Sequence, residues 1–98
     1  MSEQSVFITL LTIELVIPHA QSLKDKRSEV RGLKERIRNK FNASVAEVGY
    51  LDKWQRTVLA VCLVGSDKRQ LESNNARIRT LCEEASGVEV MSIDQEWL

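Results

Sequence analysis

The chain has 98 residues, 43% of them apolar, and its fourteen Lys and Arg residues balance fourteen Asp and Glu residues. This length supports one hydrophobic core rather than two, so we expect a single domain over residues 1–98. The zero net charge and the ordinary apolar fraction exclude charge-driven disorder and a uniformly cationic nucleic-acid-binding protein.

The first predicted element is a strand over residues 6–17, which is rich in Val, Ile, Leu and Thr and ends at Pro18. Its apolar run is too short to cross a bilayer as a helix, and no basic region or cleavage pattern precedes it. We therefore expect a cytoplasmic protein with no membrane partner. The residues expected to face the core are Phe7, Thr9, Leu11, Ile13, Leu15 and Ile17.

The second predicted element is an amphipathic helix over residues 23–41. Ser22 and Asp25 have the spacing of a capping box, which satisfies free amide groups at a helix start. Asn42 is a suitable left-handed cap at the other end. The apolar stripe of this helix consists of Leu23, Val30, Leu33, Ile37 and Phe41.

The second half of the chain repeats this alternation of strands and a helix. Short strands are predicted over residues 43–50 and 55–64, joined by a connection that contains Trp54. A second helix over 67–86 would start at Ser66 as N-cap, and Gly87 would end it. Residues 88–98 alternate as a closing strand. The stripe of the second helix consists of Leu71, Ile78, Leu81, Cys82 and Ala85, and Asn75 shares it.

The order strand, helix, strand, strand, helix, strand is typical of the α+β ferredoxin-like fold, βαββαβ. Two right-handed crossovers place both helices on one face of a four-stranded antiparallel sheet. The expected strand order is 4-1-3-2. The two cysteines, Cys62 and Cys82, fall in apolar segments, so we expect buried, reduced thiols rather than a disulfide framework.

The helix-free face of the predicted sheet is more apolar than such a face normally is. An apolar patch of this kind indicates dimerisation or the docking of a partner protein. The alternative is that a loop or the Trp97 side chain covers it. Trp54 would either anchor an interface or fold back onto the open sheet face. The expected interface residues are Val6, Ile8, Leu10, Trp54, Ala60 and Cys62, with Val64 beside them.

Charge is unevenly distributed along the balanced chain. Eight of the fourteen basic residues lie between Lys24 and Lys40, whereas residues 83–98 hold five acidic residues and no basic one. At about 100° per residue, five of the helix cations fall within about 80° of one another. We interpret them as a basic ridge that binds RNA phosphates with little base readout. The ridge consists of Lys24, Arg27, Arg31, Lys34 and Arg38.

A solvated helix face is the alternative to a binding ridge. Acidic neighbours would then balance its charge, and Lys26, close to the apolar stripe, would extend its ammonium group to solvent. The acidic residues within reach would be Glu35, Glu72, Glu83 and Glu84.

Motifs of enzymes and metal sites are missing from the sequence. There is no CxxC pair, no P-loop and no GxGxxG, and residues 55–64 lack the aromatics that an RNA-recognition motif stacks on bases. His19 is a loop residue. Glu14 and Glu47 lie in predicted strands and would be neighbours, but strand acids usually stay hydrated. We therefore expect a non-enzymatic protein without a metal ion or cofactor.

The segment Ser22–Asn42 reads S-L-K-x-K-R-x-x-V-x-x-L-x-x-R-x-R-x-x-F-N, and S-V-A-E-V and D-x-W-Q follow it. This pattern resembles the YlxP-like family of small bacterial proteins, over roughly Thr12 to Val64. The resemblance implies a ferredoxin-like fold and no established activity. Members of that family are often encoded beside translation and ribosome-maturation factors, so the resemblance favours contact with RNA or a ribosomal particle.

Overall fold

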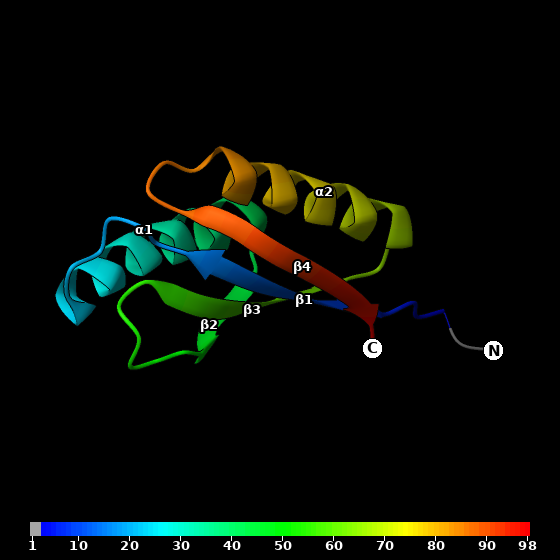
Figure 1. Ribbon diagram of the computed structural model, residues 1–98. Coiled ribbons are helices and arrows are strands. Elements are labelled where there is room, and N and C mark those ends of the chain that lie inside the picture. The colour runs from blue at the N-terminus through cyan, green and yellow to red at the C-terminus, as the bar shows by residue number, and fades with distance from the viewer. Residues whose placement is uncertain (1–2) are drawn as a thin grey trace.

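Four strands and two helices alternate along the chain in the predicted order (Figure 1). The computed structural model describes residues 3–98. Each element begins and ends within a few residues of its predicted bounds. The elements are β1 (Phe7–Val16), α1 (Leu23–Phe41), β2 (Ser44–Gly49), β3 (Arg56–Gly65), α2 (Lys68–Glu84) and β4 (Glu89–Trp97).

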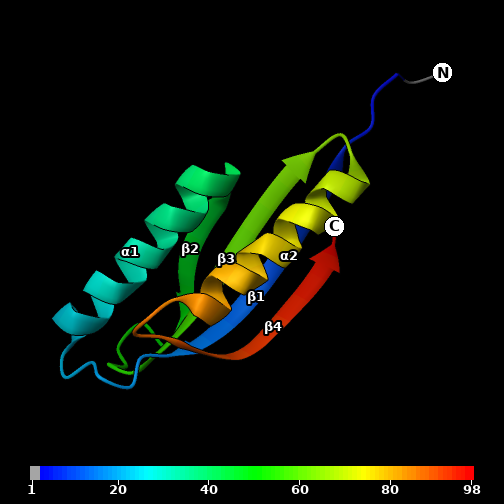
Figure 2. The same cartoon turned by 90° about the horizontal axis from the view of Figure 1, so that it is seen from above.

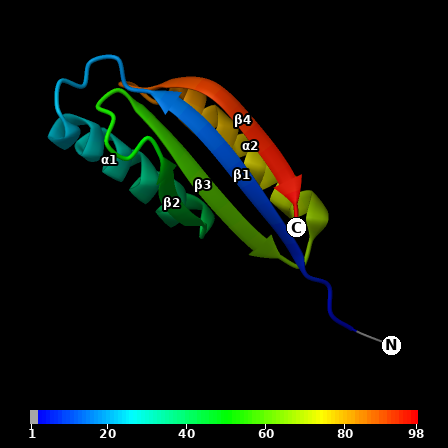
Figure 3. The same ribbon diagram turned by 60° about the horizontal axis from the view of Figure 1, so that its bottom comes forward.

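The strands form one sheet in the order β2-β3-β1-β4, and each neighbouring pair is antiparallel. Seen from above, both helices lie over the same face of the sheet (Figure 2). Seen from below, the strands lie in front and their other face is free of helices (Figure 3). The ferredoxin-like prediction, including its strand order, is confirmed.

The core lies between the helices and the sheet because alternate residues of β1 and β3 face the helices. Leu11 is opposite Val61 and Ile13 is opposite Leu59, and all four side chains are buried. The helices complete this core with their apolar stripes. These buried helix residues are Val30, Leu33, Ile37 and Phe41 on α1, and Leu71, Ile78 and Cys82 on α2.

The ends of α1 follow local sequence rules. The Ser22 hydroxyl accepts a hydrogen bond from the Asp25 amide at 3.0 Å, and Asn42 adopts left-handed angles of φ 51 and ψ 46. The start of α2 differs from the prediction by one residue, since Asp67 rather than Ser66 is the N-cap. The Asp67 carboxylate accepts from two free amides, and its charge suits a helix start.

The Trp97 side chain does not cover the helix-free face of the sheet. Trp97 lies on the helix side, where its ring meets Phe7 edge-on at 6.4 Å and Lys68 Nζ lies 5.0 Å from its centroid. Both cysteines are free, and Cys82 is buried on the inner face of α2. The prediction that Cys62 is also buried is wrong, because its side chain is half-buried on the open face of β3. Within residues 3–98, neither helix has the length and apolarity needed to cross a membrane.

Candidate functional site

The basic ridge lies on the flank of α1 that faces away from α2. A groove of about 910 Å³ separates the two helices, and α1 contributes Gly32, Arg36 and Lys40 to its lining but no ridge residue. Arg36 and Arg38 are two residues apart, which places them about 160° apart around the helix axis. The ridge therefore faces outward, on the side of α1 away from the second helix.

No ridge cation forms an ion pair with a carboxylate among residues 3–98. Lys24, Arg27, Arg31 and Arg38 are exposed, and Lys34 is half-buried at the margin of the core. The two ion pairs within residues 3–98 are Lys26–Glu47 and Arg56–Glu14, so none involves the ridge. The acidic residues suggested as balancing neighbours, Glu35, Glu72, Glu83 and Glu84, form no ion pair in this part of the chain.

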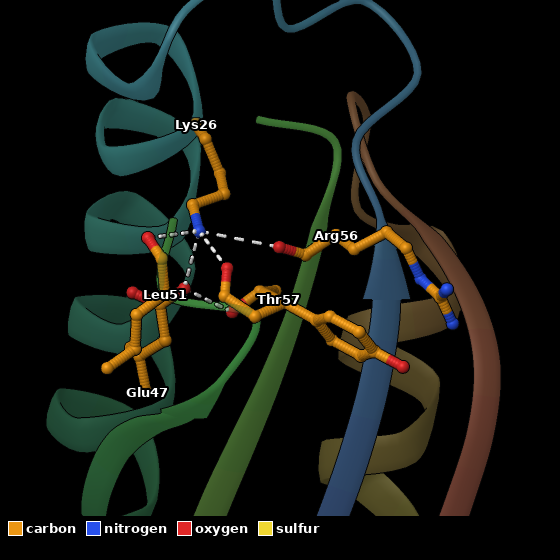
Figure 4. Close-up of polar contacts among 6 residues, drawn as sticks. Lys26, Glu47, Leu51, Arg56 and Thr57 are labelled. Carbon is orange, nitrogen blue, oxygen red and sulfur yellow. Dashed lines mark hydrogen bonds and ion pairs between the residues drawn. The ribbon is translucent and has the colours of Figure 1, made fainter. Parts of the chain in front are cut away.

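Lys26 does not reach solvent, and the prediction that it would is wrong. Its side chain is fully buried, and its Nζ donates to the carbonyl oxygens of Tyr50 at 2.8 Å, Leu51 at 3.1 Å and Arg56 at 3.4 Å (Figure 4). Carbonyl oxygens of the loop between β2 and β3 and of Arg56 thus accept the hydrogen bonds that the ammonium group would otherwise make to water.

Glu47 supplies the negative charge for this buried ammonium group. Its Oε2 lies 3.0 Å from Lys26 Nζ and accepts a hydrogen bond from the Thr57 hydroxyl at 2.7 Å. The expectation that Glu47 and Glu14 are neighbours is wrong, because β3 lies between β1 and β2 and Glu14 pairs with Arg56 on the open face. The two carboxylates therefore form no acid–base pair.

Further contacts hold the loop at residues 50–55 from its other side. The Gln55 amide donates to the carbonyl oxygens of Pro18 at 3.2 Å and Ala20 at 2.9 Å, and the Ile17 amide donates to Gln55 O at 2.9 Å. We call this loop, with its contacts to Lys26 and the segment after β1, the braced loop. Through these hydrogen bonds the loop connects α1, β1 and β3.

The braced loop exposes large apolar side chains. The exposed fraction is 55% for Leu51 and 54% for Trp54. The Trp54 ring borders a hollow lined by residues 52–56. More than half of the Trp54 side chain is thus presented at the surface.

The open sheet face carries four of the other predicted interface residues, and the fifth, Val6, lies directly before β1. Leu10 is opposite Cys62, and Ile8 is opposite Val64, which is 66% exposed, as is Val6. The apolar strip on β1 and β3 consists of Ile8, Leu10, Ala60, Cys62 and Val64, and Val6 directly precedes it. Trp54 lies at the other end of β1, where Val16 is opposite Arg56, so it does not belong to this strip.

Acidic residues border the apolar strip along β4. Asp94 is opposite Thr12 and Glu96 is opposite Leu10 on the neighbouring strand. The molecule thus carries unpaired cations on one flank of α1 and carboxylates on the edge strand β4, at the far side of the sheet. The uneven charge along the sequence thus corresponds to opposite charges on two sides of the folded molecule.

The remaining polar and nucleophilic groups form no catalytic arrangement in the part of the chain described. Asn75 is buried and donates to the Thr9 hydroxyl at 3.1 Å, while its Oδ1 has no partner. Burial raises the pKa of the Cys82 thiol to about 11, which makes it a poor nucleophile. His19 is exposed in the loop after β1. No three His, Cys, Asp or Glu side chains among residues 3–98 are grouped to hold a metal ion.

The residues that sequence reasoning missed are Lys26, Glu47 and Thr57. Their positions in the sequence pattern could have indicated them. Lys26 interrupts an apolar helix stripe, and Thr57 lies on the same face of β3 as its core residues. Three polar residues on inward-facing positions indicate a buried polar cluster. The acceptor carbonyls of the loop, however, are set by tertiary structure and have no side-chain signature.

Comparisons with known proteins agree with the fold and the motif. Residues 8–95 match the family model described as "Protein of unknown function (DUF503)". The chain is 36% identical to the uncharacterized protein YlxP of Bacillus subtilis (strain 168). The alignment spans 84 residues, which are 86% of this chain and 91% of that protein. Among solved structures, the de novo designed protein Foldit4 superposes with a TM-score of 0.51 at 16% identity, over 94% of this chain and 97% of that one. That likeness shows the fold alone.

Proposed function

Because this chain belongs to the DUF503 family of proteins of unknown function, we propose a role from its geometry: a non-enzymatic module that binds the phosphate backbone of structured RNA, on a ribosomal particle. The observation that supports this proposal is the row of unpaired cations on the outer flank of α1. Surface cations are usually balanced or scattered, whereas these five share one flank and one direction.

The dimensions of the ridge suit a nucleic-acid backbone. Lys24 and Arg38 are fourteen residues apart, so the ridge is about 21 Å long at 1.5 Å per residue. A double-stranded nucleic acid presents many phosphates over such a length. The cations would contact phosphate oxygens, position the protein and contribute little base readout.

The opposite charge on β4 would orient this docking. Asp94 and Glu96 lie on the edge strand at the far side of the sheet from β2. A polyanion would attract the α1 flank and repel the β4 edge, so the protein would approach RNA with the ridge first.

The experiment is a titration of the protein against bulk ribosomal RNA and ribosomal subunits at two salt concentrations. We expect binding that weakens steeply with salt, because each phosphate contact releases counterions. The triple variant Arg27→Glu, Arg31→Glu, Arg38→Glu should lose this binding with a nearly unchanged Tm, since all three side chains are exposed.

A matched control separates the ridge from net charge. The triple variant Arg36→Glu, Lys40→Glu, Arg69→Glu changes the charge by the same amount, with two of its positions on the groove and one on α2. It should keep most of the binding. Equal losses in the two triple variants, or unchanged affinity in the ridge variant, would show that the ridge is not the binding surface.

The open sheet face supports a second candidate function, in which this chain docks a protein partner or a second copy of itself. The observation that favours it is that Val6 and Val64 are each 66% exposed at one end of the apolar strip. In that case the ridge would only keep the protein hydrated.

A further inference from the structure

We propose that the braced loop provides a stacking site for an unpaired RNA base, with the Trp54 indole as the platform at the start of the basic ridge. This inference rests on the proposed function and narrows its ligand. The preferred RNA is a single strand next to a helix, in which the backbone follows the ridge and one unstacked base reaches the loop.

One buried side chain joins the first turns of α1 to the braced loop. Lys26 lies in the first turns of α1, between the ridge residues Lys24 and Arg27, and its Nζ contacts the loop carbonyls of Tyr50 and Leu51 (Figure 4). The length of a single lysine side chain therefore separates the helix backbone from the loop backbone. A nucleotide strand bound to the first turns of the ridge comes within reach of the loop.

Trp54 is the aromatic side chain of this loop that remains available. The Tyr50 ring is covered by the Arg56 guanidinium, whose centre lies 4.3 Å from the ring centroid. Trp54 has no ring or cation contact of this kind among residues 3–98 and is 54% exposed. Every base has a π-face, so a free indole beside cations binds single strands with little sequence preference.

The brace prepares the loop for this contact. Lys26 binds two loop carbonyls and the carbonyl of Arg56 at the start of β3, and Gln55 fixes the loop to the segment after β1. A loop that is held in one conformation before binding loses little conformational entropy when a ligand arrives. An exposed indole on a rigid loop is therefore an efficient contact.

The charges around the loop favour RNA over an apolar protein partner. Lys53 lies next to Trp54, and Lys24 and Arg27 lie on the adjacent helix turns, whereas Asp52 is the one acidic residue of the loop. A phosphate on either side of the stacked base would meet Lys53 or the ridge. A protein surface that bound Trp54 here would need its own acidic residues at these positions.

The test compares two RNA probes, a short oligouridine and a blunt-ended RNA duplex of equal length, each titrated at several salt concentrations. Trp54→Ala should weaken binding of the oligouridine by about tenfold or more and leave binding of the duplex unchanged. The slope of affinity against salt should stay the same, because no charge is removed. The ridge variant should instead weaken both probes and reduce the slope.

Two control variants make the outcome specific to stacking. Trp54→Phe keeps an aromatic face and should retain most of the oligouridine affinity, whereas Leu51→Ala removes an equally exposed apolar side chain of the same loop and should change nothing. Each variant is checked by its Tm. Oligouridine binding that survives Trp54→Ala overturns the stacking site while the phosphate ridge stands, and a wild-type protein that binds neither RNA overturns both.

Discussion

At the scale of single residues, the most constrained group in the molecule is the buried ammonium of Lys26. It has four partners: Glu47 Oε2 at 3.0 Å and the carbonyl oxygens of Tyr50, Leu51 and Arg56. A buried charge is tolerated only when its hydrogen bonds replace those of water. The same group also holds the braced loop in place, so its loss would affect both stability and the shape of the loop.

We predict that Lys26→Met destabilises the protein by about 3 to 5 kcal/mol, because it removes the ammonium group that pairs with the Glu47 carboxylate and donates to three carbonyl groups. Glu47→Gln should have a smaller effect, about 1 to 2 kcal/mol, because the ammonium group keeps its carbonyl partners. Urea unfolding of the three proteins measures this difference. Equal losses for the two variants would mean that the carbonyl contacts contribute nothing.

At the scale of elements, α1 combines three surfaces on one helix. Its apolar stripe faces the sheet, its ridge faces outward, and Gly32 and Arg36 face the groove toward α2. Gly32 is a poor residue for a helix interior. A Cβ atom placed on it would meet no atom within 4 Å, so the packing against α2 does not require a glycine there.

Gly32→Ala should therefore stabilise the protein by about 1 kcal/mol, the difference in helix propensity between the two residues. The matched control is Gly49→Ala in β2, where the new Cβ would lie 2.8 Å from Val58 Cγ2 and should destabilise the fold. Thermal unfolding of both variants shows whether the Tm of each one rises or falls. A loss of stability in Gly32→Ala would indicate that the helices approach each other more closely than the groove suggests.

The elements show which features sequence patterns can predict. Ser22, Asp25 and Asn42 specify the ends of α1 through local hydrogen bonds and backbone angles, so their roles were predictable from spacing. Ser66 and Asp67 are both good capping residues, and the sequence alone did not decide between them. Lys26 was assigned to the surface because its acceptors are carbonyls 24 to 30 residues away, which only the folded chain brings together.

At the scale of the whole molecule, the sheet separates two surfaces of different character. The helix side carries the ridge, and the open side carries the apolar strip bordered by Asp94 and Glu96. Four of the six predicted interface residues lie on that strip, because strand alternation and register follow from the sequence pattern, and Val6 lies directly before β1. Trp54 does not join them, because the direction of a loop residue depends on how the loop is held.

Thiol reactivity can probe the open face, because the two cysteines lie on opposite sides of the sheet. We predict that a thiol reagent modifies half-buried Cys62 in the folded protein, while Cys82, whose pKa burial raises to about 11, reacts only after unfolding. The raised pKa leaves less thiolate at neutral pH than an ordinary cysteine has. The modification rate is measured over a range of protein concentrations, together with the light-scattering mass.

Self-association through the open face would slow the modification of Cys62 as concentration rises, in parallel with a doubling of the mass. Leu10→Lys, which places a charge opposite Cys62, would reverse both effects. A constant modification rate and the mass of one chain across the micromolar range would leave only a different protein as partner for the strip.

The strand register places the start of β1 and the end of β4 at the same end of the sheet. β1 starts beside the end of β3, where Phe7 is opposite Gly65, and the Leu98 amide donates to Ile8 O at 2.9 Å. The braced loop lies at the other end of the sheet, beyond Val16 (Figure 3). The start of β1 and the end of β4 are therefore convenient points for immobilisation or a fluorescent label. A molecule anchored there would present Trp54 and Lys24 outward. A label there would respond to an RNA strand that extends along the full length of the ridge, but not to an RNA strand that binds only at the loop.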